Sequence, residues 1–251
     1  MKKFLIEVLV FLVILLTSFY LIFLRADGKT DAFYLRLTTK KQHSLILGNS
    51  RAAQAIKPSV LNDVLSRNDL FNYSFSIHLS PYGPTYLNSI KRKLDQDTKD
   101  GIFILSVDPW SISTVSADPN DTAKFGELKM FLGKIRHVNL YPNVPYLFSS
   151  YDKPYYNLLL NAKSPTTLHR DGWLEVNVTM DSAKVKRRIE RKISQYRKGN
   201  LPTHKFSEVR LEYLIKTIEY LKNFGKVYLV RLPVITEIMA IEQELIPDFD
   251  S

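Results

Sequence analysis

Residues 44–51 read Ser-Leu-Ile-Leu-Gly-Asn-Ser-Arg (SLILGNSR), a short apolar run that ends in a turn. The run from Ser44 to Leu47 predicts a buried strand, because turn-forming residues follow it directly. Gly48 permits a tight turn, and Ser50 then stands where a helix can begin. This stretch therefore predicts the first strand–turn–helix unit of a sheet.

The same alternation continues downstream. Further apolar runs predict strands over 71–75, 101–107 and 226–231, and amphipathic stretches predict helices over 58–66, 84–94, about 182–198, 207–224 and 236–245. The first of these helices places Val60, Leu61, Val64 and Leu65 on one face, and the second places Tyr86, Leu87, Ile90 and Leu94 inward. Continuous apolar strands separated by helices predict an α/β fold with a three-layer, doubly wound, mostly parallel sheet of flavodoxin-like type.

An apolar segment precedes this domain. Phe4 to Leu24 contains only three residues that are neither apolar nor aromatic, and a helix of this length covers roughly 30 Å, the thickness of a bilayer core. No small-residue cleavage site follows, so we expect an uncleaved transmembrane signal anchor over 1–25, with a buried core helix as the alternative. Lys2 and Lys3 favour a cytoplasmic N-terminus and an extracytoplasmic domain, although Arg25 and Lys29 after the span weaken this orientation.

The remainder divides into a polar juxtamembrane linker over 26–43 and one α/β domain over 44–251. An irregular insertion rich in Pro, Asn, Asp and Tyr interrupts the domain at about 113–180. The chain has 251 residues and no cysteine, which excludes disulfides, thiol nucleophiles and cysteine-ligated metals. No carboxylate or histidine cluster has metal-ligand spacing, so no metal or cofactor is expected.

The turn at residues 48–51 is the first candidate site, because ligands of open α/β sheets bind at the carboxyl ends of strands. Gly48 and Asn49 bend the chain, and the backbone amides beside Ser50 and Arg51 can hold an anion or an oxyanion. The alternative is an ordinary turn without a ligand.

The chain resembles the SGNH (GDSL-type) hydrolase superfamily. The resemblance lies in a strand, a Gly-x-Ser-Arg turn and a helix that form the first unit of an α/β domain behind a membrane anchor. The chain is most similar to the bacterial membrane-anchored branch associated with cell-envelope acyl transfer. This resemblance implies a serine esterase or O-acyltransferase, with Ser50 as nucleophile and its amide in the oxyanion hole. Asn49 stands where the family usually has Asp.

Two further family elements are altered in this chain. The family's second oxyanion donor is a Gly after the next strand, and here the segment Asn72-Tyr73-Ser74-Phe75-Ser76 leaves the backbone amide of Ser74 or Ser76 to serve. After the third strand, Asp108 takes the place of the family's Gly-x-Asn-Asp. It can bind an acyl acceptor, orient Arg51, or cap the turn that Pro109 begins.

The general base is missing from its family position. The family supplies it from Asp-x-x-His near the C-terminus, yet none of the five histidines has an Asp three residues before it and none follows Arg231. We therefore expect either a C-terminally incomplete domain or a non-catalytic protein that uses the fold to bind or scaffold. A substitute base is His169, in the loop His169-Arg170-Asp171-Gly172-Trp173. There Arg170 can hold an anion and Trp173 can stack on a sugar, or Asp171 and Gly172 simply form a turn with Trp173 in the core.

The formal charge of +10 is concentrated in one stretch. Lys184 to Lys198 carries eight basic residues and one Glu, a net charge of +7, on an amphipathic helix. Such a helix can lie on anionic lipid, collect an anionic polymer, or be solvated. The expected partners are membrane lipid, an envelope glycan or acyl-carrying polymer, and a membrane acyltransferase, and no nucleic acid.

Overall fold

The computed structural model describes residues 1–160 and 164–250. Three residues of the predicted insertion, 161–163, and the C-terminal Ser251 therefore lie outside the described residues. The central sheet is formed by β1 (Ser44–Leu47), β2 (Leu70–Asn72), β3 (Gly101–Ser106) and β8 (Gly225–Val230). The strands lie in the order β2-β1-β3-β8, and each neighbouring pair is parallel. The predicted α/β class with a parallel sheet is thus confirmed.

Side chains of β1 alternate between two core clusters. Leu45 and Leu47 join the main core, to which α4 (Pro84–Lys93) and α8 (Glu208–Lys222) also contribute. Ile46 joins a second cluster with Ala52 of α2 (Ser50–Ala55) and with Leu61 of α3 (Pro58–Val64). Opposite faces of a strand therefore bury different helices, as period-two alternation requires. The complete three-layer, doubly wound arrangement stays a prediction.

The two predicted helical faces have different outcomes. In α4 the predicted inward residues Tyr86, Leu87 and Ile90 are all buried, as is Leu94, which caps the helix. In α3 the predicted face is largely exposed, with 74% of Val64 accessible, and only Leu61 packs inward. The reason is position, because α3 packs on β2, which is the edge strand of the sheet.

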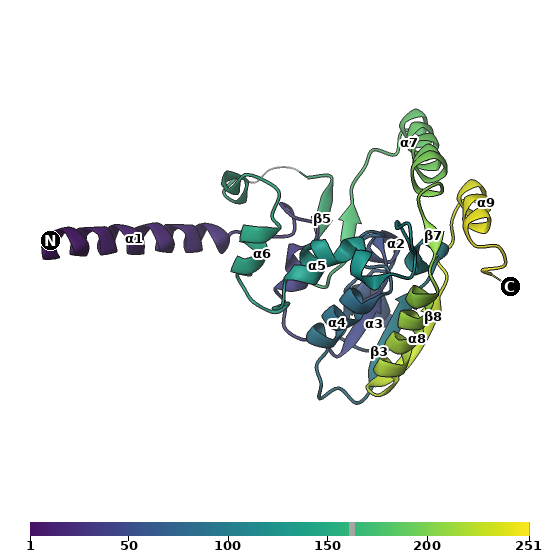
Figure 1. Ribbon diagram of the computed structural model, residues 1–251, viewed down its shortest axis with the longest axis horizontal. Helices are drawn as coiled ribbons and strands as arrows, with labels where there is room; N and C mark the ends of the chain where they lie inside the picture. The colour runs from purple at the N-terminus through teal and green to yellow at the C-terminus, as the bar shows by residue number, and fades with distance from the viewer. Residues whose placement is uncertain (161–163, 251) are drawn as a thin grey trace.

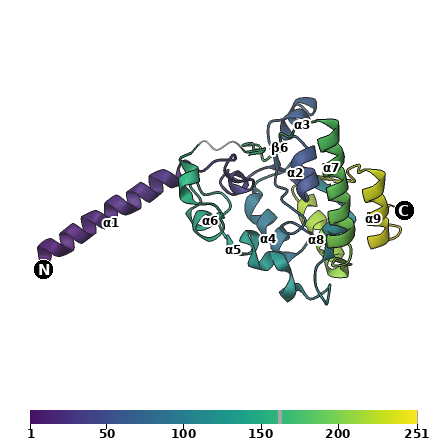
Figure 2. The same ribbon diagram turned by 90° about the horizontal axis from the view of Figure 1, so that it is seen from above.

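Helix α1 (Lys2–Phe23) projects away from the domain (Figures 1 and 2). It is long and apolar enough to span a membrane or to act as a signal anchor, and the apolar part of it is not buried in the protein. The alternative of a buried core helix is therefore excluded.

The segment over 26–43, expected to be a linker, packs into the domain instead. It contains a short helix, η1 (Tyr34–Leu37), and buries Tyr34 and Arg36 completely. The Arg36 guanidinium donates hydrogen bonds to the carbonyls of Asn72 and Gly172 at 3.1 Å and 2.6 Å. These partners are distant in the chain, so the local polar composition gave no sign of the burial.

Elsewhere the chain is irregular where the sequence predicted it to be. The insertion contains short pieces: η3 (Thr122–Lys124), η4 (Gly126–Lys129), α5 (Phe131–Lys134), α6 (Val144–Ser149), η5 (Tyr155–Leu158) and the antiparallel hairpin β5 (Thr166–Leu168) and β6 (Leu174–Val176). The insertion begins with β4 (Ser113–Thr114), which pairs with β7 (Lys205–Phe206). The remaining elements are η2 (Pro109–Ile112), α7 (Ser182–Ser194) with its π-helical continuation η6 (Gln195–Asn200), and α9 (Thr236–Leu245). Both views place α7 and α9 at the end of the domain remote from α1 (Figures 1 and 2).

Candidate functional site

The turn between β1 and α2 is held in one conformation from both sides. Gly48 has φ +146°, and a Cβ at this position would lie 2.9 Å from the Cβ of Ser106. Its N–H donates to the Tyr86 hydroxyl at 3.1 Å, and its carbonyl accepts from the Ser80 hydroxyl at 2.7 Å. Only glycine fits this backbone and space, so the turn that presents Ser50 is preorganised.

Asn49 links this turn to the end of β3. Its buried side chain caps α2 by accepting the Arg51 N–H at 3.0 Å, and its amide nitrogen donates to Asp108 at 2.7 Å. An Asp at position 49 could accept but not donate, and it would place a second carboxylate beside Asp108. Asn49 therefore joins the ends of β1 and β3 by a hydrogen bond that Asp could not donate.

Arg51 belongs to a network of charged side chains. Its guanidinium donates to Asp108 at 3.3 Å and to Glu242 of α9. Glu242 is 1% exposed, and it also accepts from Arg231 at 2.7 Å and from the Trp110 indole at 2.6 Å. Burial alone would lower the pKa of Arg51, but the charges of Asp108 and Glu242 outweigh it and the net shift is upward. Arg51 is therefore a fixed cation.

Asp108 has two of the three roles that its position allowed. It caps η2 by accepting the Ser111 N–H at 2.9 Å, and it pairs with Arg51. Burial raises the pKa of Asp108, while Arg51 and Asn49 act in the opposite direction. Its two oxygens are thus occupied by protein donors, and within the described part of the chain it makes no hydrogen bond to Ser50.

A cavity of about 510 Å³, called the Ser50 pocket here, opens beside Ser50 and Arg51. Arg188 and Lys192 of α7 line it, and Val234, Ile235 and Ile238 form an apolar wall, while its lining includes no Asp or Glu. Partial burial and the nearby charge of Arg51 both lower the pKa of Lys192. The pocket therefore suits a ligand that is anionic at one part and apolar at another.

Ser50 itself is half-buried at the edge of this pocket. Within residues 1–160 and 164–250, its hydroxyl forms no hydrogen bond to another side chain or to the main chain. The hydroxyl is thus available to a ligand, but no described histidine or carboxylate is in place to take its proton.

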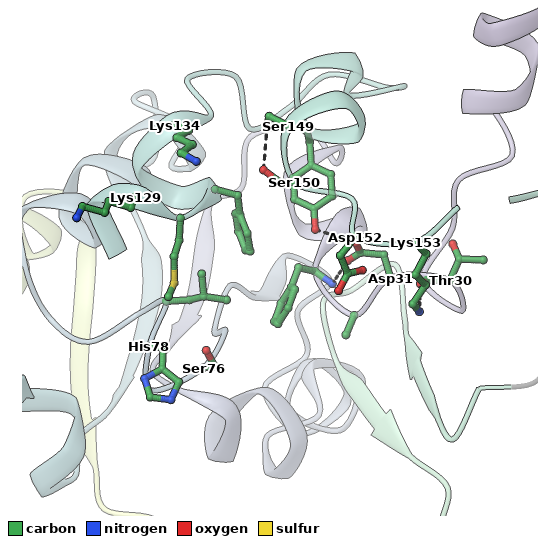
Figure 3. A pocket seen from close by; sticks show the side chains of 16 residues that line it. Thr30, Asp31, Ser76, His78, Lys129, Lys134, Ser149, Ser150, Asp152 and Lys153 are labelled. Carbon is green, nitrogen blue, oxygen red and sulfur yellow. Dashed lines mark hydrogen bonds between the residues drawn. The ribbon is translucent and has the colours of Figure 1, made fainter. Parts of the chain in front are cut away.

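The serines after β2 do not lie in the Ser50 pocket. The Ser74 N–H donates to the Asn72 side chain at 3.1 Å and its hydroxyl to the Ile46 carbonyl at 3.3 Å, so Ser74 holds the loop. Ser76 lines a different cavity of about 550 Å³ with His78 and Lys129 (Figure 3). The Ser74 N–H is thus already engaged by Asn72, while the Phe75 N–H donates to the Gly48 carbonyl at 3.2 Å and holds this loop against the Ser50 turn. The backbone amide of Ser76 as an oxyanion donor stays a prediction.

The loop over 169–173 is the turn of the β5–β6 hairpin. His169 lies 2.8 Å from Glu175 and stacks on Trp173 with ring centroids 4.9 Å apart. The Trp173 indole donates to the Gln54 carbonyl at 2.8 Å, at the opposite end of α2 from Ser50. No contact in the described chain joins His169 to Ser50.

The rest of this loop makes structural contacts. Asp171 accepts the Trp173 N–H at 3.1 Å, and its carbonyl accepts the Asn72 N–H at 2.8 Å. Gly172 has φ +83° and abuts the Asn72 carbonyl. Arg170 is exposed, and Trp173 is half-exposed under the Lys57 ammonium, so it does not anchor the core. Asp171 and Gly172 therefore form a turn, which was one of the two alternatives that the sequence left open for this loop.

The residues that sequence reasoning missed are Glu242 and Arg231, which pair beside Arg51, and Tyr196, whose ring lies 5.7 Å from the Arg51 guanidinium and lines the Ser50 pocket. A signal existed for Glu242, because it lies four residues after Ile238 and beside Ile241 on the inward face of α9. A carboxylate in such a stripe needs a buried partner. The described residues contain no group of three or more His, Cys, Asp or Glu side chains that could hold a metal ion.

No protein-family model matches the chain, and comparison with curated proteins and with solved structures gives no match either. Fold and site together define an α/β protein with a parallel four-stranded sheet and an N-terminal apolar helix, which presents a serine at the edge of a cationic pocket.

Proposed function

We propose that the chain is a membrane-anchored protein of the bacterial cell envelope, with an SGNH-hydrolase-like domain that handles O-acyl groups on an envelope glycan or polymer. The observation that carries the proposal is the position of Ser50. It follows β1 directly, in a turn fixed by Gly48 and Asn49, and it borders the Ser50 pocket.

The strand order supports the proposed fold. The order β2-β1-β3-β8 matches the first four positions of a flavodoxin-like sheet, in which the direction of winding changes between β1 and β3. Ligands bind at this switch point. Ser50 follows β1 and Asp108 follows β3, so the two candidate residues flank it. Core clusters on opposite faces of β1 support the three-layer, doubly wound arrangement.

The pocket lining supports the ligand class. Arg51, Arg188 and Lys192 favour a phosphate or carboxylate, and the apolar wall favours an acyl chain. An O-acylated anionic glycan or polymer combines these features in one molecule.

In the proposed reaction, the Ser50 hydroxyl oxygen attacks the ester carbonyl. The bond from this oxygen to the acyl carbon forms, the bond to the leaving alcohol breaks, and the serine proton passes through a base to that alcohol. Water or an acceptor hydroxyl then removes the acyl group. Lys192 is the candidate base within the pocket, because its lowered pKa increases the neutral fraction that can accept a proton. Serine–lysine pairs perform this chemistry on other folds.

The location is proposed on similar grounds. Helix α1 would anchor the chain with its N-terminus in the cytoplasm and the domain outside, where a membrane acyltransferase can supply acyl groups. Helix α7, with the concentrated positive charge, lies at the end remote from α1 (Figure 1). This position favours an anionic polymer over the lipid of the membrane that α1 enters.

The test is covalent labelling of the full chain with a fluorophosphonate. We expect a mass increase on Ser50 in the wild-type protein, none on that peptide in Ser50→Ala, and full labelling in Ser194→Ala, which removes an exposed serine of α7. Lys192→Gln should slow labelling most at neutral pH. Absence of Ser50-dependent labelling in wild type would refute the enzymatic proposal.

A second candidate, non-catalytic binding, is favoured by one observation: no described base contacts the Ser50 hydroxyl. It predicts that hexyl phosphate binds the full chain in titration calorimetry with equal affinity in wild type and Ser50→Ala. The double variant Arg188→Gln, Lys192→Gln should then bind about tenfold more weakly, since two charge-assisted contacts are lost. Equal binding by the double variant would contradict both candidates.

A further inference from the structure

The end of α1 is packed into the domain. Phe23 is buried, and its ring meets Phe148 of α6 and Tyr155 of η5 edge-on, each with centroids 5.2 Å apart. The Tyr141 hydroxyl donates to the Leu24 carbonyl at 2.7 Å. Helix α1 is therefore joined to the region over 140–160 by direct contacts (Figures 1 and 2).

The outer side of this junction is apolar. Tyr141, Phe148, Leu159 and Leu160, called the collar here, are 55%, 65%, 58% and 56% exposed. Each is tied to the end of α1: the first two contact Leu24 and Phe23, and the other two share a cavity with Arg25 and Lys29. Single exposed apolar side chains are ordinary, but four around the end of an apolar helix form a patch.

Cationic groups accompany the collar. Arg25 and Lys29 are both exposed and follow α1 directly. Aromatic side chains and snorkelling cations are typical of the layer where a membrane meets water. Neither Arg25 nor Lys29 forms a salt bridge within the described residues, so both are available to lipid phosphates.

We propose that the collar lies in the interfacial layer of the membrane that α1 enters, so that the domain is seated on the lipid surface instead of swinging on a tether. The occupant of the patch is lipid, because Phe148 and Tyr141 touch the end of the apolar α1 and the exposed cations Arg25 and Lys29 lie beside the collar, where they can meet lipid phosphates. Seating the collar turns α7 and the Ser50 pocket away from the bilayer. This inference does not depend on any reaction at Ser50.

The absence of cysteine makes the test direct. Single-cysteine variants of the full chain, Phe148→Cys and Leu160→Cys, are labelled with an environment-sensitive nitrobenzoxadiazole and reconstituted in vesicles containing brominated phosphatidylcholine. Leu12→Cys in α1 is the membrane reference, and Val64→Cys, on the exposed face of α3, is the aqueous reference. Thermal unfolding of each variant checks that it is folded.

We expect bromolipid to quench the labels at 148 and 160 about threefold more than the label at 64, because collar residues lie at the acyl boundary. Quenching at 148 and 160 equal to that at 64, with strong quenching at 12, would show a domain held off the membrane and would overturn the inference. Absence of quenching at 12 would also overturn it, since α1 would then lie outside the bilayer. Ser50 labelling is independent of all these outcomes.

Discussion

The two ends of the domain use opposite physical chemistry. At the end joined to α1, the collar exposes apolar side chains, and the segment over 26–43 that follows α1 buries Arg36 against main-chain carbonyls. At the remote end, Arg51 and Arg231 both pair with the carboxylate of Glu242, and Arg51 borders an open cationic pocket.

The difference is visible in the two arginines. Burial without a carboxylate partner lowers the pKa of Arg36 to about 9, whereas carboxylate charges outweigh burial at Arg51 and raise its pKa. A guanidinium bound to carbonyls ties chain segments together. A guanidinium bound to carboxylates beside a pocket also holds charge where a ligand can meet it. We therefore propose that one end anchors the domain and that the other binds a ligand.

The largest effect is expected from Glu242→Ala. This change leaves the cations of Arg51 and Arg231 without their buried partner, so the free energy of unfolding should fall by about 3–5 kcal/mol. Urea unfolding of the full chain in detergent measures it. The matched control is Glu244→Ala, whose pair with Arg197 is about half-exposed and should contribute less than about 1 kcal/mol. Equal losses of unfolding free energy in both variants would show that the buried pairs of Glu242 stabilise the fold no more than an exposed pair does.

Gly172→Ala should have the next largest effect, because it disturbs the two carbonyls, of Asn72 and Gly172, to which Arg36 donates. The added Cβ would lie 2.0 Å from the Asn72 carbonyl oxygen at φ +83°, so we expect a loss of at least about 2 kcal/mol. Gly199→Ala is the control, because nothing lies within 4 Å of its Cβ position. Urea midpoints compare the two variants. A Gly172 variant as stable as the control would contradict the close approach of Gly172 to the Asn72 carbonyl.

Lys93 gives a pH test of the packing of the segment over 26–43, because Thr39 is one of its partners. Burial lowers its pKa to about 7, and its ammonium donates to Thr39 and Val138. The unfolded chain then binds more protons than the folded chain between about pH 7 and pH 10. The free energy of unfolding should therefore rise with pH across this window, by up to about 1 kcal/mol per pH unit. Lys93→Met should lack the rise; the same slope in both proteins would assign it to other groups.

The smallest effect is expected from Tyr141→Phe. The substitution removes one half-exposed hydrogen bond to Leu24 and should cost about 0.5 kcal/mol. The apolar ring remains, so bromolipid quenching of the label at position 160 should not change. Loss of that quenching would show that the hydrogen bond, and not the apolar surface, seats the domain.

Local patterns predicted much of the fold. The strand over Ser44–Leu47 and the helix over Thr236–Leu245 have the predicted bounds, because apolar runs and turn residues mark both. Burial of Arg36 depends on partners more than thirty and more than a hundred positions away, so no local pattern could reveal it. The same holds for the candidate site: the turn at Ser50 was predictable, but the approach of α7 and α9 to it was not.

The most direct test of the two-ended arrangement measures energy transfer from the domain to the membrane surface. Tyr156→Cys, near the collar, and Met239→Cys, in α9 at the remote end, are each labelled with a donor in the reconstituted full chain, and the acceptor is a headgroup-labelled lipid. We expect clearly stronger transfer from position 156 than from position 239. Equal transfer, or stronger transfer from position 239, would contradict it.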